Sequence, residues 1–308
     1  MTTKYPETEE VKEEAVGLYE LIGGVKNGEL TSQDIAFRIK SEMEPDVRGR
    51  LSAWKEELEF WEEYAKIYFN LEKAWPYSRL TSTFKKFLEP KEGEHWLDVG
   101  CGPLRISELL YEKSNREIRE IEAIDIVLEP AREKLANLAK RGVYLPVNLR
   151  YASITDPLPY PNDFFDGIGA NLILSYVTDF QGKKGKGALE GILREMFRVL
   201  KPGGHMVWST PKHGVNFKWV FIASIPDMLN VYEYIVHKDF TRILQGTRIL
   251  KHAMTIQEKG TMGIYTFLPK DELENLLFQI GFVNPVWEKT FTQQVWVNRV
   301  EKPPLSNP

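Results

Sequence analysis

The segment at residues 97–103, which reads Leu-Asp-Val-Gly-Cys-Gly-Pro, constrains the fold of this chain more than any other. A strand-like stretch at residues 95–96 precedes this segment and a helix-like stretch at residues 106–110 follows it, so we expect a strand-to-helix turn. Glycines at such a turn let the main chain approach a ligand where a Cβ would collide. The next helix begins with unpaired N–H groups and partial positive charge. The segment therefore predicts an α/β fold with a site for a compact, polar, adenosine-like molecule.

A carboxylate further along the chain supports this interpretation. Residues 121–125 read as an apolar strand ending in Asp125, about twenty residues after the loop. An acid in this place can accept hydrogen bonds from both hydroxyls of a ribose held by the glycine loop. The alternative is that Asp125 caps a helix beginning near Pro130, but the spacing favours the ribose role. Asp98 adds a fixed carboxylate at the end of the preceding strand.

The loop differs from the fingerprint of a nicotinamide-binding protein. That fingerprint is Gly-x-Gly-x-x-Gly, in which the third glycine allows close packing of the helix on the strand. Here Arg105 occupies the third glycine position. A dehydrogenase is therefore disfavoured.

Three motifs together resemble class I S-adenosylmethionine-dependent methyltransferases. Residues 98–104 are similar to the first motif of that family, acid-x-Gly-x-Gly-x-Gly, with Leu104 in place of the last glycine. Residues 156–166 resemble the family's segment before the fourth strand, and residues 193–204 resemble its helix and Lys-Pro-Gly-Gly turn before the fifth. The resemblance covers roughly residues 95–214. It is greatest to the small-molecule methyltransferases of the ubiquinone and menaquinone biosynthesis type.

The resemblance implies a Rossmann-like sheet of seven mostly parallel strands with one antiparallel terminal strand. The two closing strands, at residues 282–286 and 293–300, are separated by too few residues for a crossover helix, so we expect a hairpin. We expect a helical N-terminal extension at 1–94, a cofactor-binding core at 95–214, a helical lid insertion at 215–263, and at 264–302 a helix and strand hairpin that complete the core.

The same resemblance implies S-adenosylmethionine as the cofactor. The first glycine motif would hold its methionine portion, Asp125 its ribose, and the segments after the second and third strands its adenine. Where the family often has an acid for the adenine amino group, this chain has Ser153, which can accept one hydrogen bond. The implied cofactor residues are Asp98, Gly100, Cys101, Gly102, Asp125, Ile126, Ser153, Ile154, Asn171 and Leu172. Tyr77 and Arg79 are candidates to close over the cofactor carboxylate, although a helix-capping arginine is the commoner case.

Methyl transfer from a sulfonium depends more on aligning the acceptor atom with the methyl group than on a strong base. Good alignment contributes about 7–11 kcal/mol to lowering a barrier. His213 follows the fifth strand and is the best candidate for a general base, and the alternative is a histidine on a surface loop. Tyr176 is a candidate to face the transferred methyl group, and the alternative is a residue packed on the sheet.

Aromatic segments suggest where the acceptor binds. They predict an apolar cavity for a small apolar or aromatic acceptor, although core packing explains the same residues. The inserted segment would supply the roof with Trp219, Phe221, Ile222, Met228, Tyr232 and Tyr234, and a helical stripe of Trp54, Leu58, Trp61, Ala65 and Tyr68 a second wall. A protein or nucleic-acid methyltransferase and a non-catalytic cofactor-binding protein remain the alternatives.

Composition limits the partners and the compartment. The net charge of −4 and the lack of a basic stripe argue against a nucleic-acid partner. The single cysteine and an N-terminus without an apolar core favour the cytoplasm. The longest apolar stretch is far below the ~20 residues that span a bilayer. The five histidines show no metal-ligand spacing, so we expect no metal. The oligomeric state is not indicated.

Overall fold

The computed structural model describes residues 55–66, 75–228 and 241–305. The chain divides into two compact units, Met1–Phe60 and Trp61–Pro308. In the first unit, residues 55–60 are helical, and Lys55 and Glu59 form an ion pair of 3.8 Å on one helical face. The second unit begins with helical residues 61–66 and contains the sheet. The predicted aromatic stripe lies only partly inside the described residues, because Trp54 and Tyr68 fall outside them.

The second unit alternates strands and helices along the chain, as the sequence pattern predicts. Its elements are α4 (Trp75–Phe87), β1 (His95–Val99), α5 (Arg105–Lys113), β2 (Glu120–Asp125), α6 (Glu129–Ala139), β3 (Val147–Tyr151), β4 (Phe165–Ala170), η1 (Leu174–Tyr176), β5 (Asp179–Phe180), β6 (Lys183–Lys184), α7 (Lys186–Val199), β7 (Leu200–Pro211), α8 (Phe217–Met228), α10 (Thr241–Thr261), α11 (Lys270–Ile280), β8 (Val283–Thr290) and β9 (Val295–Glu301).

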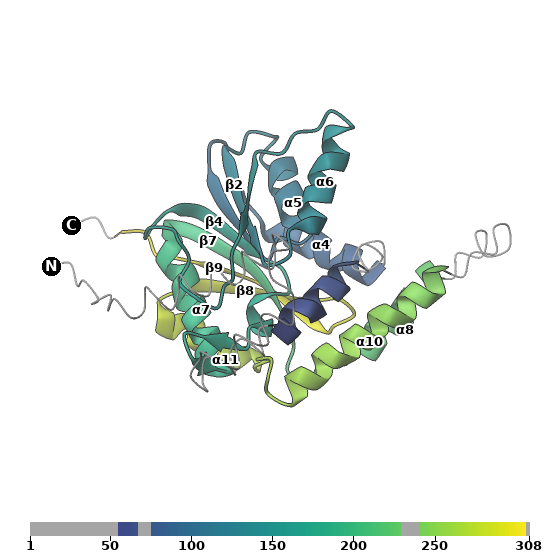
Figure 1. The fold of residues 1–308 in the computed structure, drawn as a ribbon. Helices are drawn as coiled ribbons and strands as arrows, with labels where there is room; N and C mark the ends of the chain where they lie inside the picture. The colour runs from purple at the N-terminus through teal and green to yellow at the C-terminus, as the bar shows by residue number, and fades with distance from the viewer. Residues whose placement is uncertain (1–54, 67–74, 229–240, 306–308) are drawn as a thin grey trace, which may run out of the picture. The chain divides into compact units, whose positions relative to one another are not determined.

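The central sheet has seven strands in the order β3-β2-β1-β4-β7-β9-β8 (Figure 1). The strands from β3 to β7 pair in parallel, whereas β9 is antiparallel to both β7 and β8. The predicted fold class is therefore confirmed, including the terminal hairpin and its single antiparallel strand. The carboxyl ends of β1, β2 and β4 lie at the same edge of the sheet, where parallel α/β proteins bind ligands.

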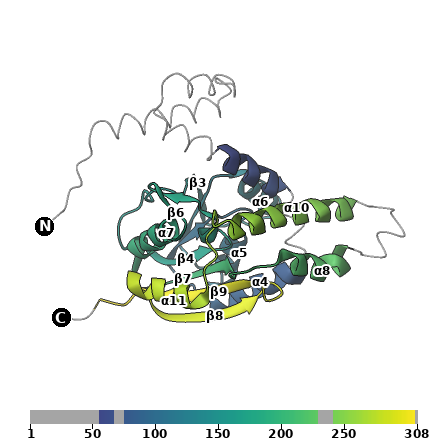
Figure 2. The same cartoon turned by 90° about the horizontal axis from the view of Figure 1, so that it is seen from below.

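Helices cover both faces of this sheet (Figures 1 and 2). Helices α7 and α11 bury apolar side chains such as Ile192 and Leu277 in the main hydrophobic cluster with β1, β4 and β7. Helices α4, α5 and α6 lie on the other face. All five residues of β1 are buried, including the polar His95 and Asp98, as expected for a central strand of a sheet covered on both faces. The glycines of β4 let neighbours approach closely, since a Cβ at Gly167 would lie 2.4 Å from the Trp96 ring.

The sequence signals at helix ends correspond to the observed ends. The helix expected within residues 264–302 is α11, which begins at Lys270 directly after Pro269. Gly281 follows its last residue with φ of 115°, the left-handed conformation that closes a helix at little cost for glycine. The helix α6 begins at Glu129 with Pro130 in its first turn, where a missing N–H is harmless.

The inserted segment is helical wherever the structure describes it. Helices α8 and α10 contact each other and run side by side (Figure 2). Of the roof residues named above, Trp219 is 58% exposed and Ile222 is 50% exposed. The side chains of Met228, Tyr232 and Tyr234 lie outside the described residues. Among the described helices, none combines the length and apolarity needed to cross a membrane.

Candidate functional site

The glycine loop after β1 is held against β2 and leaves open space in front of it. The Cys101 N–H donates to the Ile124 carbonyl over 3.0 Å. Gly100 has a φ of +63°, and a Cβ there would lie 2.7 Å from the Ile173 side chain. Gly102 has a φ of +44°, and no atom lies within 4 Å of the position its Cβ would take. Gly100 is therefore required for packing, while Gly102 leaves room for a ligand.

Leu104 adopts a backbone conformation that normally favours glycine. Its φ is +62°, at the position where the resembling motif has its last glycine. A left-handed residue other than glycine costs about 1–2 kcal/mol. The Leu104 side chain is fully buried beside Cys101, Ala123 and Leu128, which contributes about 1.5–3 kcal/mol. Burial of the leucine thus offsets the backbone strain, and the loop keeps its shape without the third glycine.

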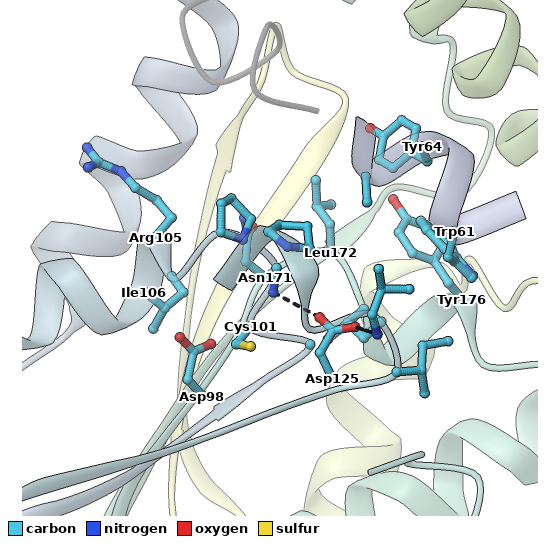
Figure 3. A pocket seen from close by; sticks show the side chains of 18 of the residues that line it. Trp61, Tyr64, Asp98, Cys101, Arg105, Ile106, Asp125, Asn171, Leu172 and Tyr176 are labelled. Atoms are coloured by element: carbon cyan, nitrogen blue, oxygen red, sulfur yellow. Dashed lines mark hydrogen bonds between the residues drawn. The ribbon is translucent and has the colours of Figure 1, made fainter. Parts of the chain in front are cut away.

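Asp125 connects the two loops that border the pocket (Figure 3). Its Oδ2 accepts a hydrogen bond of 2.8 Å from the Gly102 N–H, and its Oδ1 accepts one of 2.9 Å from the Val127 N–H. These bonds go to the loops and not to the first turn of α6. Burial raises the pKa of Asp125, while the backbone amides of Gly102, Val127 and Ile126 around the carboxylate act in the opposite direction.

Asp98 anchors the start of α5 to the end of β1. Its Oδ2 accepts hydrogen bonds from the Ser107 N–H at 3.0 Å and from the Ser107 hydroxyl at 2.6 Å. The side chain is 1% exposed, and burial raises its pKa to about 7 despite those hydrogen bonds. The partner Ser107 belongs to no motif, so nothing in the sequence marks its role.

The turn after β4 is fixed by a chain of hydrogen bonds. The Leu172 N–H donates to the Ser209 hydroxyl at 2.8 Å, and that hydroxyl donates to the Asn171 Oδ1 at 2.8 Å. The Asn171 amide nitrogen donates to the Tyr77 hydroxyl at 3.3 Å. Asn171 and Leu172 are thus positioned by β7 and α4, two elements distant in the sequence. Tyr77 was expected from the sequence near the cofactor carboxylate, whereas no sequence signal marks Ser209.

Aromatic side chains close the other side of the pocket (Figure 3). The rings of Trp61 and Tyr176 stack with centroids 5.5 Å apart and an interplanar angle of 29°. Tyr176 also contacts Tyr265 and Phe267, with centroids at 5.3 Å and 5.8 Å. Burial raises the pKa of Tyr176 well above its usual value, so its phenol is neutral at physiological pH. This side of the pocket presents flat, uncharged surfaces.

Most of the expected cofactor residues gather around one pocket, together with Tyr176. The pocket is lined by Trp61, Tyr64, Ala65, Tyr77, Asp98, Gly100, Cys101, Gly102, Pro103, Arg105, Ile106, Asp125, Ile126, Val127, Pro130, Asn171, Leu172, Ile173, Tyr176 and Ile256. Trp61 and Ala65 belong to the predicted aromatic stripe. Tyr64 and Ile256 were not predicted, because nothing in the local sequence distinguishes them from ordinary helix residues.

Three of the expected cofactor and catalytic residues lie outside this lining, and so does Arg79, which is exposed on α4. Ile154 is 9% exposed and belongs to the main hydrophobic cluster. The Ser153 hydroxyl lies 2.8 Å from that of Thr155 and accepts a hydrogen bond from the Thr155 N–H. His213 is exposed in the turn after β7, where its Nδ1 donates to the Phe267 carbonyl at 3.1 Å. That bond leaves the His213 Nε2 as the nitrogen able to accept a proton.

Comparison with known proteins shows a family match over more than half of the chain. Residues 90–261 match the family model described as a methyltransferase domain. This range includes the glycine loop, Asp125, the β4 turn and the two inserted helices.

Curated relatives match a similar part of the chain. The ubiquinone/menaquinone biosynthesis C-methyltransferase UbiE of Edwardsiella ictaluri is 36% identical over 122 residues, which are 38% of this chain and 42% of the relative. The demethylmenaquinone methyltransferase of Listeria monocytogenes is 28% identical over 186 residues, 57% of this chain and 73% of the relative. The chain spans about two fifths of the length of the first of these.

Among solved structures, the N-methyltransferase NodS from Bradyrhizobium japonicum, crystallised in complex with S-adenosyl-L-homocysteine, aligns with a TM-score of 0.47. The alignment has 13% sequence identity and covers 76% of this chain and 90% of NodS.

Proposed function

Because this chain belongs to the methyltransferase domain family, we propose that it transfers a methyl group from S-adenosylmethionine to a small, apolar or aromatic acceptor. The single observation that carries the proposal is the pocket, in which the glycine loop and Asp125 face an aromatic wall formed by Trp61, Tyr64 and Tyr176. When bound, the cofactor supplies an activated methyl group on a sulfonium, which an aligned nucleophile displaces in line. The chain's own residues hold, orient and desolvate the reactants.

The pocket fits an adenosyl group at two places. The space in front of Gly102 would be filled by any Cβ, so a ligand can approach the main chain there. Each oxygen of Asp125 accepts one backbone hydrogen bond, and a carboxylate offers about four lone-pair sites in all. One further site on each oxygen can therefore accept the two ribose hydroxyls. Ile126 and Val127 border the same region with apolar surface suited to the adenine ring.

The methionine portion belongs on the opposite side of the glycine loop. Asp98 lines the pocket there, and Arg105 at the start of α5 lines it as well. The first N–H groups of α5 lack helical partners and carry partial positive charge. A cofactor carboxylate is stabilised by these donors, and its ammonium group by Asp98 in the ionised form.

The aromatic wall supports the proposed class of acceptor. Trp61, Tyr64 and Tyr176 present faces and edges that pack well against another flat ring. The neutral phenol of Tyr176 positions an acceptor and does not remove a proton from it. The relatives named above are described as quinone-biosynthesis methyltransferases, which agrees with an aromatic acceptor. His213 remains a proposed general base. Because its side chain is exposed and lies outside the pocket lining, we expect it to contribute little to the rate of methyl transfer.

A turnover experiment tests the proposal. Purified protein is incubated with S-adenosylmethionine and a panel of phenols and quinols, and S-adenosylhomocysteine is measured. We expect product with ring-shaped acceptors, little change in Tyr176→Phe, and at least a tenfold lower rate in Tyr176→Ala, because only alanine removes the stacking surface. His213→Ala tests the base directly.

Other outcomes identify the alternatives. Methylation of peptides or RNA at the expense of the ring panel would indicate a macromolecular substrate. Calorimetric binding of the cofactor without turnover on any acceptor would indicate a non-catalytic protein. Absence of cofactor binding would contradict the proposal as a whole.

A further inference from the structure

One histidine and two glutamates form a cluster at the end of the sheet opposite the pocket. His95 is the first residue of β1 and pairs with Glu120, the first residue of β2. Glu122 lies two residues further along β2, on the same face as Glu120. One potential ligand atom from each of the three side chains lies within 4.8 Å of the other two. Among the described residues, this group alone has such an arrangement of histidine, cysteine and acidic side chains.

The imidazole of His95 is buried with one nitrogen unsatisfied. Its side chain is 8% exposed, and within the described part of the chain its Nε2 has no hydrogen-bond partner. The nearest carboxylate oxygen, Glu120 Oε2, lies 3.6 Å away, beyond hydrogen-bond distance. Edge contacts with Phe164 and Phe165, each at a centroid distance of 4.9 Å, hold the ring in this orientation. A buried polar atom without a partner is destabilising unless a ligand satisfies it.

The charge state of the ring suits metal coordination. Burial is the largest influence on the pKa of His95 and lowers it, whereas Glu120 and Glu122 act to raise it. An imidazole in its neutral form has a free lone pair on one nitrogen. Metal ions bind imidazole in this neutral form.

The two carboxylates are held in place from behind. The Tyr160 hydroxyl donates to Glu122 Oε2 at 2.9 Å, and the Arg150 Nε lies 3.6 Å from the same oxygen. The Asn148 amide nitrogen donates to the Oε1 of Glu122 at 3.1 Å and also to Glu120 Oε1. Outer contacts of this kind orient carboxylate ligands in metal sites. The side chain of Glu122 is only 10% exposed, so its charge is one that a cation would stabilise.

We propose that His95, Glu120 and Glu122 bind a divalent transition-metal cation of the zinc class, with water as a fourth ligand. One imidazole nitrogen and two carboxylate oxygens form a common zinc donor set, and the nitrogen disfavours Mg²⁺ and Ca²⁺. Bond lengths of about 2.0–2.2 Å place the ligand atoms of a tetrahedral site about 3.4 Å apart. The three ligand atoms now lie within 4.8 Å of one another, so small side-chain rotations would bring them to that separation.

The bound ion would have a structural role. It would join the beginnings of β1 and β2, the two strands whose other ends carry Asp98 and Asp125. No reacting group of the pocket belongs to the cluster. The site therefore makes the cofactor-bearing strands resistant to separation without entering the methyl-transfer chemistry.

Zinc titration of untagged, chelator-treated protein tests this site. Calorimetry should show one Zn²⁺ per chain, and Co²⁺ as a spectroscopic probe should give the visible absorption of a four-coordinate complex. His95→Ala should abolish the Co²⁺ band, and Glu120→Gln should weaken Zn²⁺ binding at least tenfold. Glu117→Gln is the matched control, because Glu117 is an exposed carboxylate near β2 but outside the cluster.

The variants separate specific from adventitious binding. Glu120 is one-third exposed, so Glu120→Gln keeps the test decisive even where His95→Ala fails to fold. Equal Zn²⁺ affinity in the wild type, Glu120→Gln and Glu117→Gln would overturn the proposal, as would the absence of stoichiometric binding. The readout is metal stoichiometry, so it is independent of whether methyl transfer occurs.

Discussion

At the scale of residues, Asp98 and Asp125 end adjacent strands but are held by different groups. Asp98 accepts both of its hydrogen bonds from Ser107 within the same strand–loop–helix unit. Asp125 accepts one from each of two loops, and its oxygens face the pocket. Asp98 therefore holds the start of α5 beside its proposed contact with the cofactor ammonium group, whereas Asp125 holds the two loops beside its proposed contact with the ribose.

Replacement of Asp125 by alanine should weaken cofactor binding. The variant loses two charge-assisted hydrogen bonds to ribose hydroxyls, which corresponds to about 1–3 kcal/mol, or roughly a tenfold to hundredfold rise in Kd. Isothermal titration with S-adenosylmethionine measures the change. Glu129→Gln is the control, because the Glu129 side chain is 75% exposed at the start of the neighbouring helix. An unchanged Kd in Asp125→Ala would refute the ribose contact.

The raised pKa of Asp98 predicts a pH dependence of stability. In the unfolded chain an aspartate has a pKa near 4, whereas burial raises that of Asp98 to about 7. Stability from the protonated group is complete below pH ~4 and is lost as pH rises towards 7. The free energy of unfolding of Asp98→Asn, measured by urea denaturation, should rise relative to wild type between those pH values and stay level above. A difference independent of pH would contradict the raised pKa.

At the scale of elements, each helix joins the sheet through one buried face. In α11, Leu273, Leu276 and Leu277 are at most 2% exposed, while Phe278 is 50% exposed. The contribution of a hydrophobic side chain on this helix to the free energy of unfolding therefore depends on whether the side chain is buried or exposed, and not on which hydrophobic residue it is. The spacing of apolar residues along the sequence places Trp61 in the aromatic stripe. Its contact with Tyr176, which lies far along the chain, is seen only in the folded protein.

Two neighbouring substitutions in α11 test this statement. Leu277→Ala should lower the free energy of unfolding by about 2–5 kcal/mol, since it removes buried methyl groups and leaves a cavity. Phe278→Ala, on the exposed face of the same helix, should change it by less than about 1 kcal/mol. Both are measured by urea denaturation with a common slope. Equal losses in the two variants would mean that the buried face of α11 is assigned wrongly.

At the scale of the whole molecule, the pocket unites segments that are distant along the chain. Its walls come from residues 61–65, the loops after β1, β2 and β4, and Ile256 in α10. A ligand that contacts all of them binds the folded state alone, so it should stabilise the protein by mass action.

Addition of S-adenosylmethionine should raise the midpoint of thermal unfolding. At a concentration about 100-fold above Kd, the stabilisation is about 2.7 kcal/mol, which corresponds to several degrees. Differential scanning fluorimetry measures the shift, and Asp125→Ala at the same cofactor concentration should show a smaller one. A wild-type shift equal to that with adenosine alone would mean that the methionine side of the pocket makes no contribution.

The seven-stranded sheet was implied by the resemblance of three sequence motifs to a family, whereas the hairpin and the glycine loop were predicted from local signals in the sequence itself. Apolar runs, glycines with positive φ and the Pro269–Gly281 helix boundaries act over a few residues, and parallel sheets place strand ends at one edge. The packing of Tyr64 and Ile256, the support of Asn171 by Ser209, and the cluster of His95 with Glu120 and Glu122 required the folded chain. These contacts join residues from separate elements, and no spacing along the chain marks them, since side-chain distances across a sheet depend on strand order and register.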